Sequence, residues 1–190
     1  MKVSREQVAL NRERIVETAA RLFREKGYDG IGVADLMKGA GLTHGGFYGH
    51  FASKEDLLAE AADHALKTSV ARWEGYLAEG REAALEKIGD GYLTPQHRDH
   101  PEKGCSVTAL GADIARLGPK ARHAVTTGAS GQIAVLQQLM PGADDAERRK
   151  QALATYAAMV GAIVLSRAVD DDAMSLEVLQ AVRDSLPGLA

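Results

Sequence analysis

The sequence predicts an all-α protein of about nine helices. Aromatic residues make up only 5% of the 190 residues, and β-branched residues are scattered among Ala, Leu, Glu and Arg, which argues against a sheet. Apolar residues recur at helical spacing through most of the chain. Hydrophobic residues account for 45% and charged residues for 26% of the chain, which is typical of a globular protein.

The first predicted helix runs from Asn11 to Lys26. Its apolar face is formed by Ile15, Ala19, Leu22 and Phe23. Residues 1–11 form a polar arm in which Ser4 and Gln7 have the spacing of a capping box, so the helix can begin earlier. Residues 1–28 hold seven Lys or Arg and four Glu, although the net charge of the whole chain is −3. A basic N-terminal segment is compatible with a nucleic-acid partner.

Two further helices with a glycine turn between them are predicted up to residue 51. The apolar face of the first is formed by Val33, Leu36, Met37 and Ala40. Gly41 ends this helix because glycine tolerates positive φ, and Thr43 is expected to cap the next one. The apolar anchors of that second helix are Leu42, Phe47 and Phe51. This order is the pattern of a helix-turn-helix motif.

The second helix of the motif leaves polar residues and glycines for its outer side. These residues are Thr43, His44, Gly45, Gly46, Tyr48, Gly49 and His50. Each glycine costs a helix interior roughly 1 kcal/mol relative to alanine, so stability is lower where a bare backbone can approach a partner. Ser53 is expected to cap the next helix, which places Lys54 beside free backbone N–H groups that can hold a phosphate.

Residues 12–58 resemble the DNA-binding domain of the TetR family of transcriptional regulators. The matching stretches are RERIVETAARLFREKGYDG, VADLMKGAGLTHGGFYGHF and SKEDLL, which occur in unbroken order. The resemblance implies a double-stranded DNA partner and, most often in this family, repression. It also implies a homodimer that binds a palindromic operator and responds to a small-molecule effector.

The resemblance also assigns roles to individual residues of the motif. It implies phosphate contacts from Tyr48, His50 and Lys54. It places Thr43, His44 and Gly45 at the edge of the major groove, with Gly46 beside them. The family more often has threonine, serine or alanine at the position of Gly46 and a larger residue at that of Gly49. Base recognition is therefore expected to use fewer side chains here.

The predicted domain boundary follows residue 52. Residues 1–52 form the DNA-binding domain, and residues 53–190 form a helical effector-binding and dimerisation domain. A long helix from about Ser53 to Glu79 joins them and can transmit a displacement between them. Further helices are predicted at Arg81–Leu93, Cys105–Leu117, Pro119–Met140, Ala152–Val169 and Ser175–Leu186, and residues 95–104 are predicted to form a loop.

The helix Ala152–Val169 is apolar nearly all round and must be covered on every side. A second copy of the chain is the predicted cover, and burial within one monomer is the alternative. Close helix approach would be allowed by Ala157, Ala158, Gly161 and Ala162. The last helix would complete a four-helix interface through Leu176, Leu179, Val182 and Leu186.

An effector site is predicted among the larger side chains that interrupt the apolar faces of residues 53–190. These are Trp73, Tyr76, Tyr92, Cys105, Met140, Tyr156 and Met159, with ordinary core packing as the alternative for each. Cys105 follows a glycine at a helix start, where the helix dipole favours a thiolate. The segment KGCSVTALGADIARL resembles the branch of the TetR family that includes cysteine-based electrophile and oxidant sensors, so an electrophile is a second predicted signal.

Other classes of protein have less support. The chain does not open with the order of a signal peptide and no apolar run reaches about 20 residues, so no membrane partner is expected. A single cysteine allows no internal disulfide, which fits a reducing cytoplasm. Cys105 with His97, His100 or His123 could form a nucleophile–base pair or a metal site, but no Gly-rich phosphate loop or paired zinc-ligand motif occurs. No catalysis, cofactor or metal is predicted. The remaining alternative is a helical ligand-binding or redox-sensing protein with weak or lost DNA recognition.

Overall fold

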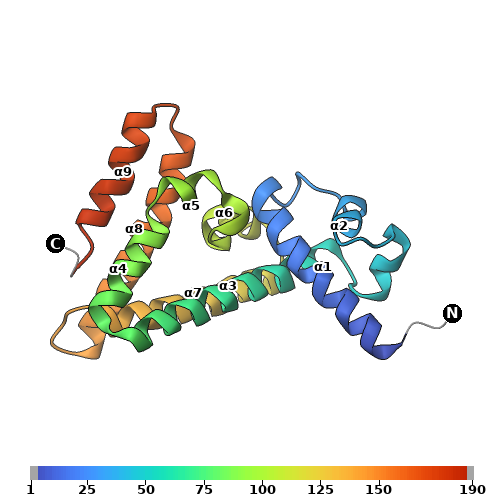
Figure 1. The fold of residues 1–190 in the computed structure, drawn as a ribbon, viewed down its shortest axis with the longest axis horizontal. Helices are drawn as coiled ribbons and strands as arrows, with labels where there is room; N and C mark the ends of the chain where they lie inside the picture. Colours follow the sequence, from blue (N-terminus) through green and yellow to red (C-terminus); the bar gives the residue numbers. More distant parts are fainter. Residues whose placement is uncertain (1–3, 188–190) are drawn as a thin grey trace.

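The computed structural model describes residues 4–187, and all regular structure in that range is helical, which confirms the all-α prediction. The α-helices are α1 (Arg5–Lys26), α2 (Val33–Gly39), α3 (Lys54–Glu79), α4 (Arg81–Tyr92), α5 (Pro95–Asp99), α6 (Ser106–Ile114), α7 (Pro119–Leu139), α8 (Asp145–Ala168) and α9 (Asp172–Asp184). Two 3₁₀ helices are η1 (His44–Gly49) and η2 (Pro101–Lys103). Figure 1 shows an elongated molecule with α1 and α2 at one end, α8 and α9 at the other, and α3 and α7 side by side between them.

Helix α1 begins earlier than Asn11, at the capping box recognised in the sequence. Ser4 Oγ accepts a hydrogen bond from the backbone N–H of Gln7 at 3.1 Å. The helix ends at Gly27, whose φ of 76° is favourable for glycine. Its predicted apolar face is buried, with Ile15 and Phe23 completely inaccessible.

The turn after α2 is a Schellman motif around Gly41. The N–H of Leu42 donates to the C=O of Met37 and that of Gly41 to the C=O of Lys38, both at 2.9 Å. Gly41 has a φ of 69°, as the predicted glycine turn requires. This turn sets the angle between α2 and η1.

The prediction of an α-helix capped by the Thr43 side chain is wrong. Residues 44–49 form a 3₁₀ helix, in which the N–H of Gly46 donates to the C=O of Thr43 at 3.1 Å. Thr43 occupies the N-cap position but its side chain makes no capping hydrogen bond. Three glycines in six residues weaken the α-helical preference, so a short, tighter helix anchored by Phe47 forms instead.

Helix α3 joins the two apolar clusters of the molecule. Ser53 Oγ accepts from the N–H of Asp56 at 3.0 Å, which confirms the predicted cap. Residues up to Ala62 pack in the cluster with α1 and α2, whereas Leu66 and Trp73 pack in the cluster with α4 and α8. The domain boundary after residue 52 stays a prediction.

Glycines in α7 allow it to pack closely on α3. A Cβ atom at Gly128 would overlap the Leu66 side chain, and one at Gly131 would lie 2.9 Å from Val70. These glycines lower helix propensity, but they permit the two long helices to approach each other.

The prediction of an irregular loop at residues 95–104 is wrong. Pro95 and Pro101 begin α5 and η2, where their fixed φ and missing N–H are tolerated. Thr94 Oγ1 accepts from the N–H of His97 at 3.2 Å and caps α5. The proline-rich composition therefore marks two helix starts.

Helix α8 is long and apolar enough to cross a membrane by length and composition. This finding departs from the prediction that no run is long enough, although a core helix of a globular protein passes the same test. One side of α8 packs in the body through Ala152, Tyr156, Met159 and Ile163. C-terminal to the exposed Lys150, the exposed residues of its other side are all apolar or small: Leu153, Ala154, Ala157, Ala158, Gly161, Val164, Leu165 and Ala168. We call this set the α8 apolar face.

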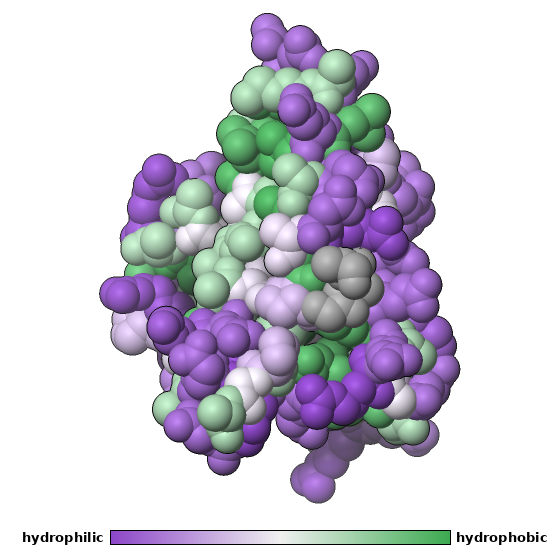
Figure 2. Space-filling view, turned by 90° about the vertical axis from the view of Figure 1, so that its left-hand side faces the viewer, coloured by the Kyte–Doolittle hydropathy of each residue, from purple (hydrophilic) through white to green (hydrophobic). Residues whose placement is uncertain are grey.

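The free surface at this end differs in part from the predicted interface. Ala162, Leu179 and Leu186 are buried within their own chain, because one side of each helix covers the body core. On α9, Leu176 is exposed together with Met174. Figure 2 shows apolar side chains gathered over the upper part of this end of the molecule, flanked by hydrophilic ones.

Candidate functional site

Helix η1 and the turn before it form a polar surface at one end of the molecule. All seven side-chain or glycine positions predicted there are solvent-accessible: Thr43, His44, Gly45, Gly46, Tyr48 and Gly49 are exposed, and His50 is half-buried. Tyr48 has 71% of its surface exposed and stands edge-on against the buried Phe47 ring, with centroids 5.2 Å apart. The structure thus brings the predicted DNA-contacting residues onto one surface.

The fold itself does not require glycine on this surface. A Cβ atom at Gly45 or Gly49 would meet no heavy atom within 4 Å, and one at Gly46 would make an ordinary 3.7 Å contact with Met37. None of the three has positive φ. Alanine would fit and would favour a helical turn, so packing within this chain gives no reason for glycine at these three positions.

Lys54 and His50 lie beside this surface. The Lys54 Nζ atom is 4.3 Å from the centroid of the Tyr28 ring, a cation–π contact that holds the ammonium group at the first turn of α3. The His50 Nδ1 atom is buried and makes no hydrogen bond within residues 4–187. A positive group and a helix N-terminus together are suited to a phosphate.

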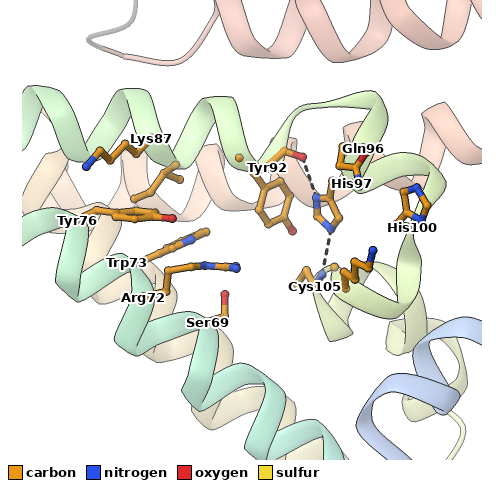
Figure 3. Close-up of a pocket in the computed structure, with 14 residues that line it drawn as sticks. Ser69, Arg72, Trp73, Tyr76, Lys87, Tyr92, Gln96, His97, His100 and Cys105 are labelled. Carbon is orange, nitrogen blue, oxygen red and sulfur yellow. Dashed lines mark hydrogen bonds between the residues drawn. The ribbon is translucent and has the colours of Figure 1, made fainter. Parts of the chain in front are cut away.

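A pocket with a cavity volume of about 160 Å³ lies between α3, α4 and the segment from α5 to Cys105. Figure 3 shows the side chains of Trp73 and Tyr76 extending from α3 toward α4. Of the predicted effector residues, Trp73, Tyr76, Tyr92 and Cys105 line this pocket.

The other predicted effector residues lie outside the pocket lining. Tyr156 is behind Cys105, with its Oη atom 3.9 Å from the Cys105 Sγ atom. Met159 and Met140 are completely buried in the body core. Their position is that of ordinary packing residues.

The polar residues of the lining were not predicted, because the predicted effector site was built from larger side chains that interrupt apolar faces. They include Ser69, Arg72 and His97. A helical-face pattern could have found two of them, because Ser69, Arg72, Trp73 and Tyr76 are spaced i, i+3, i+4 and i+7. Polar residues in that pattern are easily interpreted as solvent-facing.

His97 connects the end of α4 to the start of α6. Its Nδ1 atom lies 2.8 Å from the C=O of Tyr92, and its Nε2 atom accepts from the N–H of Cys105 at 3.0 Å (Figure 3). Nδ1 therefore carries the proton, since a carbonyl only accepts. A Cβ atom at Gly104 would overlap the imidazole, so glycine is needed there. Because both ring nitrogens are engaged by backbone groups, His97 is not a general base for Cys105.

A series of side-chain hydrogen bonds leads from the Cys105 thiol through Tyr156 and Gln132 to Ser69, which also lines the pocket. Tyr156 Oη donates to Gln132 Oε1 at 2.8 Å, so the thiol is the donor in the 3.9 Å contact with Tyr156. Burial raises the pKa of Tyr156 and keeps its hydroxyl neutral. Gln132 Nε2 then donates to Ser69 Oγ at 3.1 Å. This chain ties α6, α8, α7 and α3 together.

Lys103 and His100 do not act on Cys105 as free positive charges. His100 Nδ1 is 3.2 Å and Lys103 Nζ is 4.0 Å from Glu102 Oε1. This carboxylate offsets the positive charge that Lys103 and His100 could otherwise direct at the Cys105 thiol.

The segment that starts at the pocket also contacts the end of α1. Arg24 donates to the C=O of Glu102 from Nε at 3.1 Å and from Nη2 at 2.6 Å. At the far end of α6, Asp113 Oδ2 accepts from the N–H of Tyr28 at 2.9 Å. A displacement of residues 102–113 would therefore act directly on the α1–α2 connection.

Stability is expected to fall on acidification because of His97. Desolvation is the main cause that lowers the pKa of His97 from 6.5 to about 4. The unfolded chain binds the proton first, so the folded state is at its full relative stability above about pH 6.5 and loses it as the pH falls toward 4. The loss is of the order of 2–3 kcal/mol. Chemical denaturation at several pH values measures it.

The matched variants are His97→Gln and His123→Gln, since His123 is exposed. His97→Gln should lower stability at neutral pH and flatten the slope between pH 6.5 and 4, whereas His123→Gln should keep the wild-type slope. Equal slopes in wild type and His97→Gln would contradict the assignment.

Comparison with known proteins gives one consistent result. Residues 15–61 match the family model described as bacterial regulatory proteins, tetR family. The chain is 28% identical over 161 residues to the HTH-type transcriptional repressor NemR of Escherichia coli, covering 80% of this chain and 81% of NemR. The transcriptional repressor KstR2 of Mycobacterium tuberculosis is 43% identical over 54 residues, which cover 28% of this chain and 27% of KstR2.

Solved structures show the same fold. The crystal structure of E. coli NemR in its reduced form superposes with a TM-score of 0.76 at 24% identity, covering 92% of this chain and 94% of that one. A TetR transcriptional regulator from Chloroflexus aurantiacus gives a TM-score of 0.74 at 25% identity, covering 94% and 95%. The likeness extends over both ends of the molecule.

Proposed function

Since the chain is a transcriptional regulator of the TetR family, we propose that it is a homodimeric repressor that binds a palindromic DNA operator. Its release would follow from a small molecule in the pocket or from modification of Cys105. The observation that carries the proposal is the exposed helix-turn-helix surface, in which three glycines that the fold does not require surround Tyr48. A cytoplasmic, non-catalytic protein fits this role.

The surface of η1 would enter the major groove of DNA. Thr43, His44 and the backbone at Gly45 and Gly46 would approach base edges, because glycine leaves no side chain between backbone and groove. Tyr48, His50 and Lys54 would contact phosphates on the flanking strand. Phosphate contacts fix the orientation of the motif, and the few base contacts supply the sequence preference.

A dimer through the α8 apolar face would present two such surfaces. Eight exposed apolar or small residues on one helix side form a contiguous patch that a second copy can cover. Two-fold symmetry requires a palindromic operator with half-sites roughly 34–36 Å apart, or a multiple of that spacing. A change in the distance between the two surfaces would then weaken binding.

The proposed signal passes from the pocket to α1 through residues 102–113. Modification of Cys105 displaces the start of α6, and Asp113 at its end holds the N–H of Tyr28. Coupling of this kind is typically 1–3 kcal/mol, equivalent to a 5- to 150-fold change in affinity. Only a modest movement at the pocket is needed.

Alkylation of Cys105 is expected to weaken operator binding within that 5- to 150-fold range. Iodoacetamide is a suitable reagent, because Cys105 is the only cysteine in the chain and the adduct would occupy the pocket. The sulfur displaces iodide, and modification is verified by mass spectrometry. Fluorescence anisotropy with a labelled operator measures the affinity.

Two variants distinguish the modification of the Cys105 thiol from the transmission of its effect through residues 102–113. Cys105→Ser should bind the operator and ignore the reagent. Asp113→Ala should be alkylated normally but lose less affinity, while Asp90→Ala, at a surface ion pair with Arg183, should respond like wild type. Equal operator affinity of alkylated and unmodified wild type would exclude Cys105 as a signal input.

Selection of bound duplexes from a random pool tests the proposed function. The expected result is a palindrome, with affinity that falls steeply as salt rises because phosphate contacts release counterions. Tyr48→Ala and Lys54→Ala should weaken binding to all sequences. No preference among duplexes at low salt would favour the alternative, a helical sensor protein without DNA recognition.

A further inference from the structure

We propose that the pocket binds a small aromatic carboxylate, a compound with a single ring and one carboxylate group. This inference rests on the proposed function, because it names the chemical class of the effector at the same site. Three features carry it: Tyr92, Ser69 and Arg72 offer hydrogen-bond donors to the pocket, the lining is positively charged, and its walls are aromatic.

The Tyr92 hydroxyl is a donor without a partner. Tyr92 has only 6% of its surface exposed, and its Oη atom is buried without a hydrogen bond within the described residues. Burial, aided by the nearby Cys105, raises the pKa of Tyr92, so the hydroxyl keeps its proton. An unpartnered buried hydroxyl is unfavourable, and a ligand oxygen that accepts from it would remove this cost.

Ser69 and Arg72 supply further donors on the same side of the pocket. Ser69 Oγ already accepts from Gln132, which leaves its own hydrogen free to donate. Figure 3 shows the Arg72 guanidinium beside Ser69, on the side to which the Tyr92 hydroxyl points. A guanidinium and two hydroxyls together match the two oxygens of a carboxylate.

The charge of the lining favours an anion. Arg72, Lys87 and Lys103 line the pocket, and none of the described aspartates or glutamates does. Lys87 pairs with Glu79 and Lys103 lies near Glu102, whereas Arg72 has no ion-pair partner among residues 4–187. His97 adds no charge at neutral pH. Arg72 is therefore the positive group available to a ligand.

The walls and the volume favour one flat ring. Trp73, Tyr76 and Tyr92 form the aromatic part of the lining, and the Trp73 and Tyr92 ring centroids are 6.1 Å apart. The volume of about 160 Å³ is close to that of a cavity of roughly 150 Å³ that holds benzene. An aromatic ring with a carboxylate matches the volume of such a space.

Calorimetry on the DNA-free protein tests the proposal with benzoate, phenylacetate and salicylate, each compared with its amide. At least one acid should bind roughly tenfold or more tightly than its amide, because a hydrogen bond to a charged group is stronger than one to a neutral group. Acetate should bind weakly, since it lacks the ring. If no acid binds better than its amide, the proposal is overturned.

Variants locate the bound carboxylate. Arg72→Gln should lower the affinity for the tightest-binding acid by about tenfold or more, and the affinity for its amide much less. Tyr92→Phe should lower the affinity for that acid about threefold or more. Arg122→Gln removes an exposed arginine of α7 outside the pocket and should leave affinity unchanged. Circular dichroism confirms that each variant folds. Wild-type affinity in both Arg72→Gln and Tyr92→Phe would overturn the proposed site.

The outcome is independent of DNA recognition. Acid binding that depends on Arg72 would support the ligand class even if no operator were selected, in which case only the regulatory function fails. Selection of a palindrome without acid binding would leave the regulator intact and overturn the ligand class.

Discussion

Replacing Gly45 and Gly49 together by alanine is expected to stabilise the free protein and to weaken its binding to the operator. Both positions have open space for a Cβ atom and neither has positive φ, so alanine fits without strain. Each substitution reduces the freedom of the unfolded chain and should contribute about 0.4–1 kcal/mol of stability. The added methyl groups would lie between the η1 backbone and the DNA groove, at four places in a dimer.

The two effects have opposite signs and are measured separately. Thermal unfolding should show a higher midpoint, and operator affinity should fall by about tenfold or more, equivalent to at least 1.4 kcal/mol. Gly75→Ala is the matched control, because Gly75 lies on α3 with equally open space and outside the pocket lining. It should raise stability and leave operator affinity unchanged. A stabilised double variant with wild-type affinity would show that η1 does not approach DNA closely.

Local signals in the sequence predicted most of the helices. The caps at Ser4 and Ser53 and the turn at Gly41 depend on residues no more than five positions apart, so they could be recognised without tertiary information. The form of η1 was not recognised, although three glycines in six residues weaken the α-helical preference. The match of residues 15–61 to the tetR family model confirmed the TetR-like order of motifs.

The candidate sites were predictable to different degrees. The η1 surface is one continuous segment, and its composition marked it. The pocket combines residues from α3, α4 and the segment from α5 to Cys105. Its aromatic residues were predicted because large side chains interrupt apolar faces. The role of His97 was hidden, since it depends on Tyr92 and Cys105, five and eight positions away, being held on opposite sides of the ring.

Tertiary packing also decides which side of α8 and α9 is free. Ala162 and Leu179 belong to the same apolar patterns as Ala158 and Leu176, yet the first two face the body core and the last two face solvent. Periodicity shows that a helix is apolar all round, but only the position of neighbouring helices shows which side needs a second chain.

Ala158→Arg is expected to convert the proposed dimer to a monomer. Ala158 is exposed at the centre of the α8 apolar face, and a two-fold interface would bring two such arginines into an apolar contact. An unpaired charge buried there costs several kcal/mol, of the order of 3–5, which is enough to separate the subunits at micromolar concentration. Size-exclusion chromatography with light scattering measures the mass directly.

The same variant tests whether the proposed dimer strengthens DNA binding. A monomer has one η1 surface and loses the effective concentration that joins two half-sites, so operator affinity should fall by about 100-fold or more. Pocket binding should persist, because the pocket is lined by one chain. Ala78→Arg adds the same charge at an exposed position of α3 and should remain dimeric. A dimeric Ala158→Arg would place the interface elsewhere, whereas a monomer with full operator affinity would mean that each chain recognises DNA independently.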